Sequence, residues 1–152
     1  MTFRHSYYIN ITPALQAKRL FRRTLRAIDV TMAGKTILIV DDSLLITERL
    51  QAMLEGLENI GSVGCAGDYP SALQLMLAAP PDIVLLDINL PGKSGLDLLR
   101  HIKGKYPSIL VVMLTNQSGD FYRNICKKLG ADYFIDKSKE FEDIPVLLSS
   151  LL

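Results

Sequence analysis

The chain has 152 residues, of which 49% are hydrophobic and 22% are charged, and it contains no Trp. This composition is typical of a globular domain and excludes a disordered chain, and an integral membrane protein is excluded because no apolar run approaches the roughly 18–20 residues of a membrane-spanning helix. Two cysteines, Cys65 and Cys126, are too few for a disulfide scaffold, and we expect both to be small buried residues in a reducing compartment.

The net charge of +1 is the sum of two unlike parts. Residues 1–31 hold six basic residues and one acidic residue, whereas residues 32–152 hold eleven basic and fifteen acidic residues. An acidic body is a poor non-specific binder of nucleic acid. We therefore expect no direct contact with nucleic acid.

Residues 1–31 form a basic N-terminal extension with the pattern of an amphipathic helix. Thr12 and Pro13 are typical of a helix start, and apolar residues then recur at helical spacing among Lys and Arg. Three interpretations stay open: a helix that lies on an anionic membrane surface, a targeting presequence, and translated sequence upstream of a natural start at Met32. The third is favoured because an apolar strand follows Met32 almost at once. Membrane contact is expected only if the helix is native.

From residue 35 onward, short apolar runs alternate with amphipathic helical patterns. The predicted strands span residues 36–40, 60–66, 83–86, 109–114 and 133–135, and each is followed by a predicted helix, at residues 43–57, 68–79, 96–106, 120–129 and 141–152. The central strands are apolar throughout, which is typical of strands covered on both faces. The pattern predicts an α/β fold, a doubly wound five-stranded parallel sheet with helices on both faces.

Polar residues stand at the ends of four predicted strands. Asp41 and Asp42 follow the first strand, Asp87 ends the third, Thr115 ends the fourth and Lys137 follows the fifth. Ligands of an open α/β sheet bind at the carboxyl ends of the strands, so we expect these residues to meet at one edge. Three converging carboxylates repel one another unless a cation lies among them. Few protein ligands and several waters favour Mg²⁺ over Ca²⁺.

The same set of residues suits phosphoryl transfer. The charge of Lys137 and the hydroxyl of Thr115 would neutralise the oxygens of a phosphoryl group. A carboxylate can act as the nucleophile and form an aspartyl phosphate. Because Asp87 stands alone on the central strand, it is the predicted nucleophile.

Four motifs carry a resemblance to a known family: ILIVDDS at 37–43, IVLLDINLPG at 83–92 with Gly95, VMLT at 112–115 and GADYFIDK at 130–137. In these motifs the chain resembles the receiver domain of two-component response regulators, and the similarity covers residues 35–152. The resemblance implies a flavodoxin-like fold with strand order 2-1-3-4-5. It also implies a cytoplasmic phosphoprotein that catalyses only its own phosphorylation and dephosphorylation.

The resemblance assigns a role to each acidic residue of the site. Asp87 accepts a phosphoryl group from a histidine kinase or a histidine phosphotransfer protein. Asp42 binds Mg²⁺ directly, Asp41 supports the ion, and Asp87 and the backbone carbonyl of Asn89 complete the protein ligands.

The resemblance also implies a switch. Thr115 and Lys137 bind the transferred phosphoryl group, Thr115 moves inward, and Phe134 follows as the switch aromatic. The helix 4–strand 5–helix 5 face, formed by residues 120–129, 133–135 and 141–152, then changes shape. Because nothing follows the last helix in the sequence, we expect a stand-alone receiver whose output is a protein contact.

Several residues depart from the family pattern. Phe134 lacks the hydroxyl of the common Tyr, and Ser138 replaces the Pro that often follows the lysine, which argues against a cis peptide bond there. Asn116 stands where Ala or Gly is usual, and we expect it to narrow the access to Asp87. Asn89 and Gln117 occupy positions that tune the lifetime of the phosphoryl group.

Two other functions compete with a phosphorylated receiver. A pseudo-receiver would keep the fold as a protein-binding module without phosphorylation, but such domains lose the Asp or Lys that this chain keeps. A phosphatase of the aspartyl-phosphate type also uses an aspartate after the first strand. It needs a second acid two residues later, where this chain has Ser43.

Overall fold

The computed structural model describes residues 34–117 and 119–152. The N-terminal extension at residues 1–31 and the candidate start at Met32 lie outside the described residues, so their interpretations stay predictions. Within the described part of the chain, no helix is long and apolar enough to cross a bilayer.

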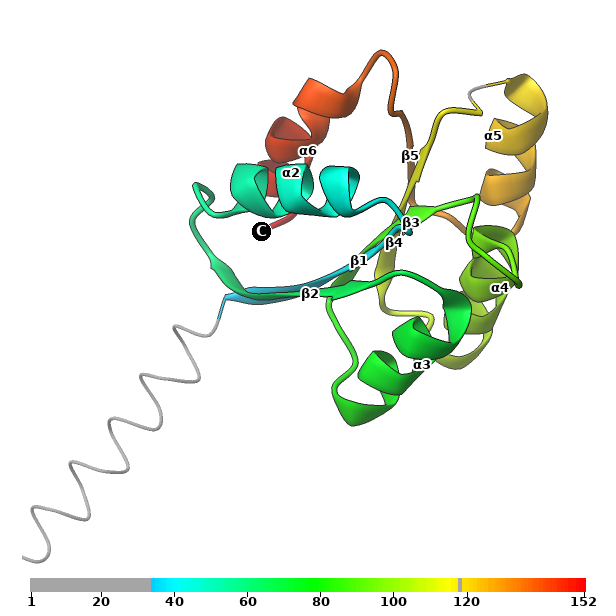
Figure 1. Ribbon diagram of the computed structural model, residues 1–152, viewed down its shortest axis with the longest axis horizontal. Helices are drawn as coiled ribbons and strands as arrows, with labels where there is room; N and C mark the ends of the chain where they lie inside the picture. Colours follow the sequence, from blue (N-terminus) through cyan, green and yellow to red (C-terminus); the bar gives the residue numbers. More distant parts are fainter. Residues whose placement is uncertain (1–33, 118) are drawn as a thin grey trace, which may run out of the picture. The chain divides into compact units, whose positions relative to one another are not determined.

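The described residues form one five-stranded parallel sheet with the order β2-β1-β3-β4-β5, which confirms the predicted fold class and strand order (Figure 1). The strands are β1 (Lys35–Val40), β2 (Ile60–Ala66), β3 (Ile83–Asp87), β4 (Leu110–Thr115) and β5 (Tyr133–Asp136). Parallel neighbours need a crossover connection, and each crossover here contains a helix. All carboxyl ends of the strands therefore lie at the same edge of the sheet.

Helices follow the strands as predicted, with one difference at the end of the chain. They are α2 (Leu44–Leu54), α3 (Tyr69–Ala78), α4 (Gly95–Lys105), α5 (Asp120–Lys128) and α6 (Ile144–Leu151). The last helix was predicted to start at Phe141, but Phe141–Asp143 is a short 3₁₀ turn, η1, and α6 begins only at Ile144. Pro145 explains this start, because a proline without a backbone N–H fits the first turn of an α-helix.

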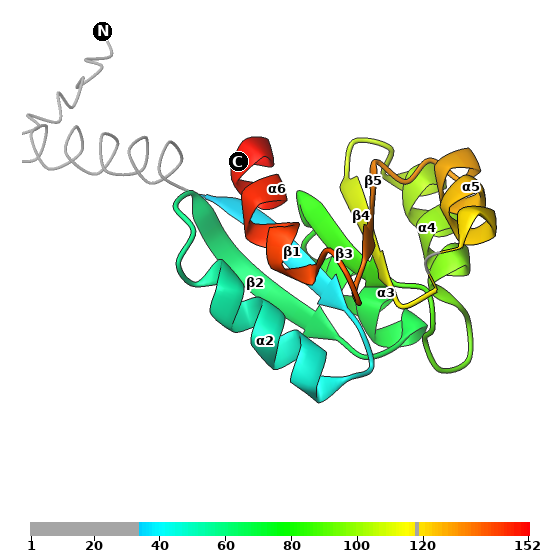
Figure 2. The same ribbon diagram turned by 90° about the horizontal axis from the view of Figure 1, so that it is seen from above.

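The helices cover both faces of the sheet (Figures 1 and 2). On one face, α2 and η1–α6 pack on one cluster of buried side chains. On the other face, α3, α4 and α5 pack on a second cluster. The alternation of side chains along each strand separates the two clusters: Val84 and Leu86 point to the α3–α4–α5 face, whereas Ile83 and Leu85 point to the α2–α6 face.

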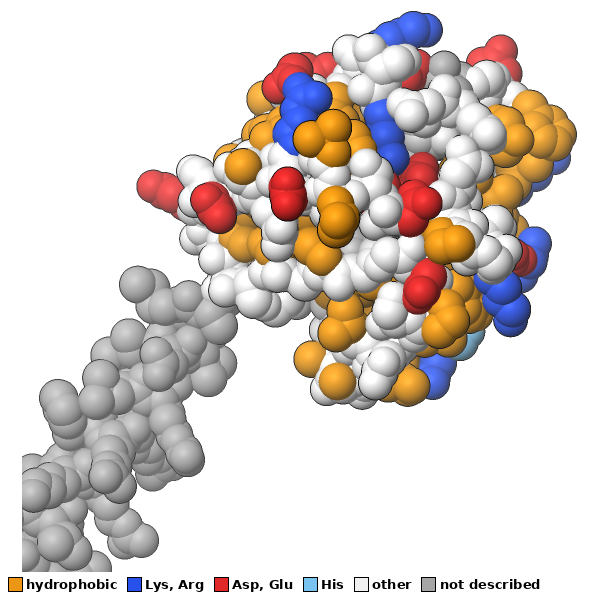
Figure 3. Space-filling view, in the orientation of Figure 1, with side chains coloured by type: hydrophobic (Ala, Val, Ile, Leu, Met, Phe, Trp, Pro, Cys, Tyr) orange, Lys and Arg blue, Asp and Glu red, His pale blue; other side chains and the backbone are white. Residues whose placement is uncertain are grey.

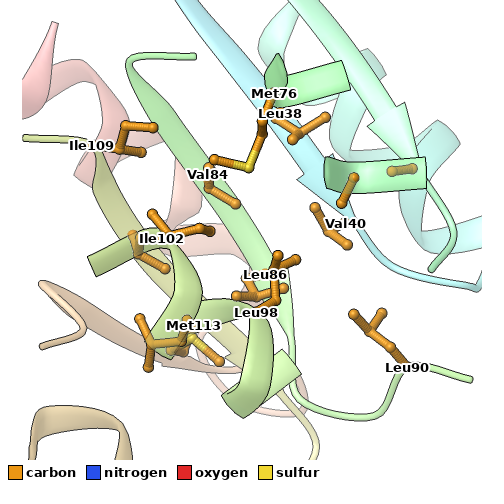
Figure 4. Close-up of a cluster of buried hydrophobic side chains, with 14 of the residues drawn as sticks. Leu38, Val40, Met76, Val84, Leu86, Leu90, Leu98, Ile102, Ile109 and Met113 are labelled. Carbon is orange, nitrogen blue, oxygen red and sulfur yellow. The ribbon is translucent and has the colours of Figure 1, made fainter. Parts of the chain in front are cut away.

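The cluster on the α3–α4–α5 face anchors these helices to the sheet (Figure 4). Leu98 and Ile102 of α4 and Met76 of α3 are fully buried against Val84 and Leu86 of β3. Each such side chain stabilises the fold by roughly 1.5–3 kcal/mol through removal of apolar surface from water. The central strands are thereby fixed, together with the residues at their ends.

The prediction that both cysteines are buried is wrong for Cys65. Cys126 is buried in the helix cluster, whereas Cys65 is exposed. Cys65 lies on β2, an edge strand that pairs only with β1, so fewer neighbours cover its side chain.

Candidate functional site

Three aspartates meet at the carboxyl edge of the sheet. Asp41 and Asp42 follow β1 directly, and Asp87 is the last residue of β3, the strand beside β1. One carboxylate oxygen of each residue lies within 4.8 Å of those of the other two. In the view of Figure 3, acidic side chains gather near the middle of this face, with a basic side chain beside them. The structure therefore brings three of the four predicted metal ligands together, the aspartates.

Backbone groups hold two of these carboxylates in place. The Ser43 N–H donates to Asp41 Oδ1 over 2.9 Å, and the backbone N–H of Asn89 donates to the Asp87 carboxylate. Asp41 and Asp87 are buried, whereas Asp42 is exposed at the rim. Of the three carboxylates, that of Asp42 is therefore the most accessible to solvent.

Lys137 supplies the positive charge of the site. Its Nζ forms an ion pair with Asp41 and lies 3.4 Å from Asp87 Oδ1, and its side chain is only 6% exposed. The ammonium group therefore touches both buried carboxylates. Three carboxylates and one ammonium still leave an excess of negative charge, which favours a bound cation.

Burial raises the pKa of Asp87 above its ordinary value, and the negative charge of Asp41 adds to the rise. Lys137 and the Asn89 N–H oppose this rise, because both favour the ionised carboxylate. The pKa of Asp87 thus depends on the balance between burial and the positive charge of Lys137.

Thr115 ends β4 and is completely buried beside the site. Its hydroxyl oxygen accepts the N–H of Gln117 over 3.0 Å, and its carbonyl accepts the N–H of Lys137 over 2.9 Å. The hydroxyl hydrogen of Thr115 remains for another acceptor. Asn116, which we expected to narrow the access to Asp87, is exposed in the loop that follows.

Ser138 has a function that the common proline could not have. Its N–H and its hydroxyl both donate to Asp136 Oδ1, over 2.9 and 2.5 Å. A proline has no N–H to donate. The described residues contain no cis peptide bond, as the sequence predicted for this loop. These bonds fix the loop that carries Lys137.

Phe134 and Tyr133 point to opposite faces of β5, as strand alternation predicts. Phe134 is half-buried and packs on the cluster of the α3–α4–α5 face, whereas Tyr133 is exposed. The guanidinium of Arg123 lies over the Phe134 ring, 4.5 Å from its centroid. The predicted switch aromatic therefore lies on β5. The strand β4, which carries Thr115, separates β5 from β3, the strand of Asp87.

The sequence did not assign a role to three residues that shape the site. A Cβ atom at Gly95 would lie 1.9 Å from the carbonyl oxygen of Asp87, so only glycine fits there. Gly95 was noted within a motif, but its contact with Asp87 was not predicted. No sequence signal revealed Arg123 or the bonds of Ser138, because each contact depends on the three-dimensional fold.

The donor set fits Mg²⁺. Hard oxygen ligands, two of them buried and held by backbone N–H groups, are the ligands that this ion takes in proteins. The side chain of Asn89 is exposed, and its backbone lies beside Asp87 in the chain. Asp41, Asp42 and Asp87 would hold the ion, whereas the predicted role of the Asn89 carbonyl stays a prediction.

Comparison with known proteins agrees with the fold. Residues 37–149 match the model of the response regulator receiver domain. The chain is 30% identical over 113 residues to the fimbriae Z protein of Salmonella typhimurium, which covers 74% of this chain and 54% of that protein. The chain thus spans about half the length of this curated relative.

Two solved structures are similar over most of this chain. The phosphorylated cyanobacterial phytochrome response regulator RcpA is 25% identical, with a TM-score of 0.68 over 78% of this chain and 91% of that one. The Mn²⁺-bound form of response regulator Rcp1 is 25% identical, with a TM-score of 0.66 over 78% and 91%. The match of the family model over most of the described residues shows that this chain belongs to the receiver domain family of two-component response regulators.

Proposed function

We propose that this receiver accepts a phosphoryl group on Asp87 from a phosphohistidine of a histidine kinase or a histidine phosphotransfer protein. The observation that supports the proposal most strongly is the contact of Lys137 with both Asp41 and Asp87 at the carboxyl edge of a receiver fold. Catalysis by this chain is limited to its own phosphorylation and dephosphorylation.

The transfer is a displacement at phosphorus. A carboxylate oxygen of Asp87 attacks, a P–O bond forms, and the P–N bond to the donor histidine breaks. The released imidazole nitrogen takes up a proton from solvent. Lys137 and the hydroxyl hydrogen of Thr115 are the groups that bind the oxygens of the transferred group.

A divalent cation, Mg²⁺ in our proposal, supplies positive charge that offsets the negative charge of the phosphoryl oxygens. Asp42 is exposed and carries no ion pair among the described contacts, so it is available as a direct ligand. Lys137 is already paired with Asp41 and Asp87 and therefore supports their positions before a phosphoryl group arrives.

The output of phosphorylation is a change at the α5–β5–α6 face. A phosphoryl group on Asp87 offers acceptor oxygens to the Thr115 hydroxyl and draws Thr115 inward. The half-buried Phe134 ring follows toward the space that Thr115 leaves. Met113 pairs with Phe134 across β4 and β5, and Thr115 lies two residues beyond Met113 on the same side of β4, which supports this coupling.

Intact-protein mass spectrometry tests the phosphoacceptor. The full chain is incubated with Mg²⁺ and phosphoramidate, with and without a chelator, beside an Asp87→Asn variant. We expect one phosphoryl group on the wild type, none on Asp87→Asn, and loss of the adduct when the chelator removes the cation. Tandem mass spectrometry of the adduct assigns the modified residue.

Two results would contradict the proposal. An adduct on Asp87→Asn would place the phosphoryl group on another residue. A wild type that stays unmodified with both phosphoramidate and a phosphorylated histidine phosphotransfer protein would instead favour the pseudo-receiver, a binding module that is not phosphorylated.

A further inference from the structure

The ring of Phe134 has two unlike kinds of neighbour. It packs on the apolar cluster of the α3–α4–α5 face, and the guanidinium of Arg123 lies over it, 4.5 Å from its centroid. Arg123 lies on α5, and Phe134 lies on β5. We call this half-buried position of the Phe134 ring its surface position.

The contact with Arg123 is the one that can distinguish the surface position from a position closer to Thr115. Phenylalanine has no hydroxyl, so no hydrogen bond selects between the surface position and a position closer to Thr115. Apolar packing does not select one position, if the ring keeps to the side of the sheet on which Met113 and the cluster lie. The attraction between a cation and an aromatic face is available only where the guanidinium reaches the ring.

We propose that Arg123 is a positioning residue that holds Phe134 in the surface position and thereby opposes the change that phosphorylation of Asp87 produces. This role rests on the proposed function, because it requires Phe134 to move when Thr115 does. In this proposal, movement of the ring toward Thr115 separates it from Arg123. The contact therefore favours the surface position, and its loss favours the inward one.

The size of the effect follows from the strength of an exposed cation–π contact. Such a contact shifts an equilibrium between two ring positions by about two- to fivefold. Phosphorylation and the inward position favour each other by linkage, so a receiver that moves inward more readily also accepts a phosphoryl group more readily. Arg123 thus lowers the response of the chain to weak phosphodonors.

The test compares three variants of the full chain. Arg123→Gln removes the cation, Arg123→Lys keeps the charge but loses the planar group, and Lys127→Gln is the matched control. Lys127 is an exposed basic residue one turn further along α5 and has no ring beneath it among the described contacts. Thermal unfolding checks that the variants remain folded.

Two measurements report the equilibrium between the surface and the inward position of the Phe134 ring. Amide NMR signals of Thr115 and Phe134 give the fraction of the inward position, with the untreated and phosphorylated wild type as end points. Mass spectrometry gives the rate of phosphorylation by phosphoramidate. We expect Arg123→Gln to move the untreated signals toward the phosphorylated end point and to raise the rate about two- to fivefold. Arg123→Lys should give signals and a rate between those of the wild type and Arg123→Gln. Lys127→Gln should match the wild type in both.

Equal signals and equal rates for Arg123→Gln and Lys127→Gln, in a wild type that is phosphorylated on Asp87, would overturn the role of Arg123 and leave the proposed function intact. A wild type that takes up no phosphoryl group from phosphoramidate or from a phosphorylated histidine phosphotransfer protein would overturn both. A faster rate in Lys127→Gln as well would show a general effect of charge on the donor and would also overturn the inference.

Discussion

The backbone of Asp87 leaves no room for a side chain at residue 95. A Cβ there would lie 1.9 Å from the Asp87 carbonyl oxygen, and the Gly95 N–H donates to the Ile88 carbonyl over 2.8 Å. The first residue of α4 therefore packs directly on the strand end that carries the phosphoacceptor. A larger residue must push the two apart.

We predict that Gly95→Ala lowers the free energy of unfolding by about 1–3 kcal/mol, as overpacking of a buried contact does, and slows phosphorylation because Asp87 shifts. The matched control is Gly104→Ala on the same helix, where a Cβ meets nothing within 4 Å. That change should stabilise the chain by about 0.4–1 kcal/mol. Denaturant unfolding measures both, and equal effects of the two variants would contradict the prediction.

Asn116 gives a second prediction at a single residue. The side chain of Asn116 is larger than that of Ala or Gly, the residues usual at this position of a receiver domain. Asn116 follows the buried Thr115 directly. Asn116→Ala should open the path of small molecules to Asp87 and so raise the rates of both phosphorylation by phosphoramidate and hydrolysis. A time course of intact mass after removal of the donor measures the hydrolysis. Equal half-lives of wild type and variant would show that Asn116 does not limit access.

At the scale of elements, Asp82 connects three strands by hydrogen bonds at the end of the sheet opposite the candidate site. Asp82 Oδ2 accepts the backbone N–H of Thr36 over 2.8 Å and its hydroxyl over 3.0 Å, and Lys35 lies 3.4 Å from Oδ1. The Asp82 carbonyl accepts the N–H of Leu110 over 3.0 Å. Asp82 thus links the amino ends of β1, β3 and β4.

The hydrogen bonds from Thr36 and the nearby charge of Lys35 hold the pKa of Asp82 below its ordinary value. A carboxyl with a lowered pKa stabilises the fold above the pKa of the unfolded chain, and this contribution disappears as pH falls through the folded pKa. We therefore predict that Asp82→Asn lowers the free energy of unfolding by about 1–2 kcal/mol at pH 7, and that the difference shrinks below about pH 4.

Urea unfolding of both proteins between pH 7 and pH 3 measures the Asp82 contribution. A matched control is Glu55→Gln, an exposed carboxyl at the end of α2 with no ion pair among the described contacts. It should change stability little at any pH in that range. A difference between wild type and Asp82→Asn that stays constant with pH would show that the charge of Asp82 is not its source.

The sequence predicts those features of the fold and the site that depend on residues adjacent in the chain. Asp41, Asp87 and Thr115 were placed because each stands directly at the end of an apolar strand, and parallel strands bring their ends together. The strand order itself came only from the resemblance to a family. Alternation of strands and helices does not by itself select one order.

Contacts between elements that are distant in the sequence were not predictable. The approach of Gly95 to Asp87 and the position of Arg123 over Phe134 depend on how α4 and α5 pack on the sheet, and no periodicity encodes these distances. The exposure of Cys65 has the same origin, because it depends on β2 being an edge strand. The start of α6 was missed for a local reason, the position of Pro145 in its first turn.

At the scale of the whole described domain, the amino and carboxyl ends of the strands differ in how completely their charges are paired. One edge is tied by Asp82, where strands meet with their charges paired. The other edge collects three carboxylates that only Lys137 offsets, so part of its negative charge has no partner among the described residues. Excess charge of one sign at a site opposes folding unless a ligand neutralises it.

A divalent cation should therefore stabilise the whole domain. We predict that Mg²⁺ raises Tm relative to a chelator, because the ion binds the folded chain and not the unfolded one. At a hundredfold excess over its dissociation constant the gain is about 2.7 kcal/mol, or on the order of 10 °C for a domain of this size. Differential scanning fluorimetry over a range of Mg²⁺ concentrations measures the shift.

Asp42→Asn is the variant that separates cation binding from general folding. Asp42 is exposed and belongs to the acidic cluster, but the ion pairs of Lys137 involve only Asp41 and Asp87. In the chelator, Asp42→Asn should unfold at or slightly above the Tm of the wild type, because one like charge is gone. In Mg²⁺ it should lose most of the rise. A full rise in Asp42→Asn would show that the cation stabilises the domain from another place and that the acidic cluster is not its site.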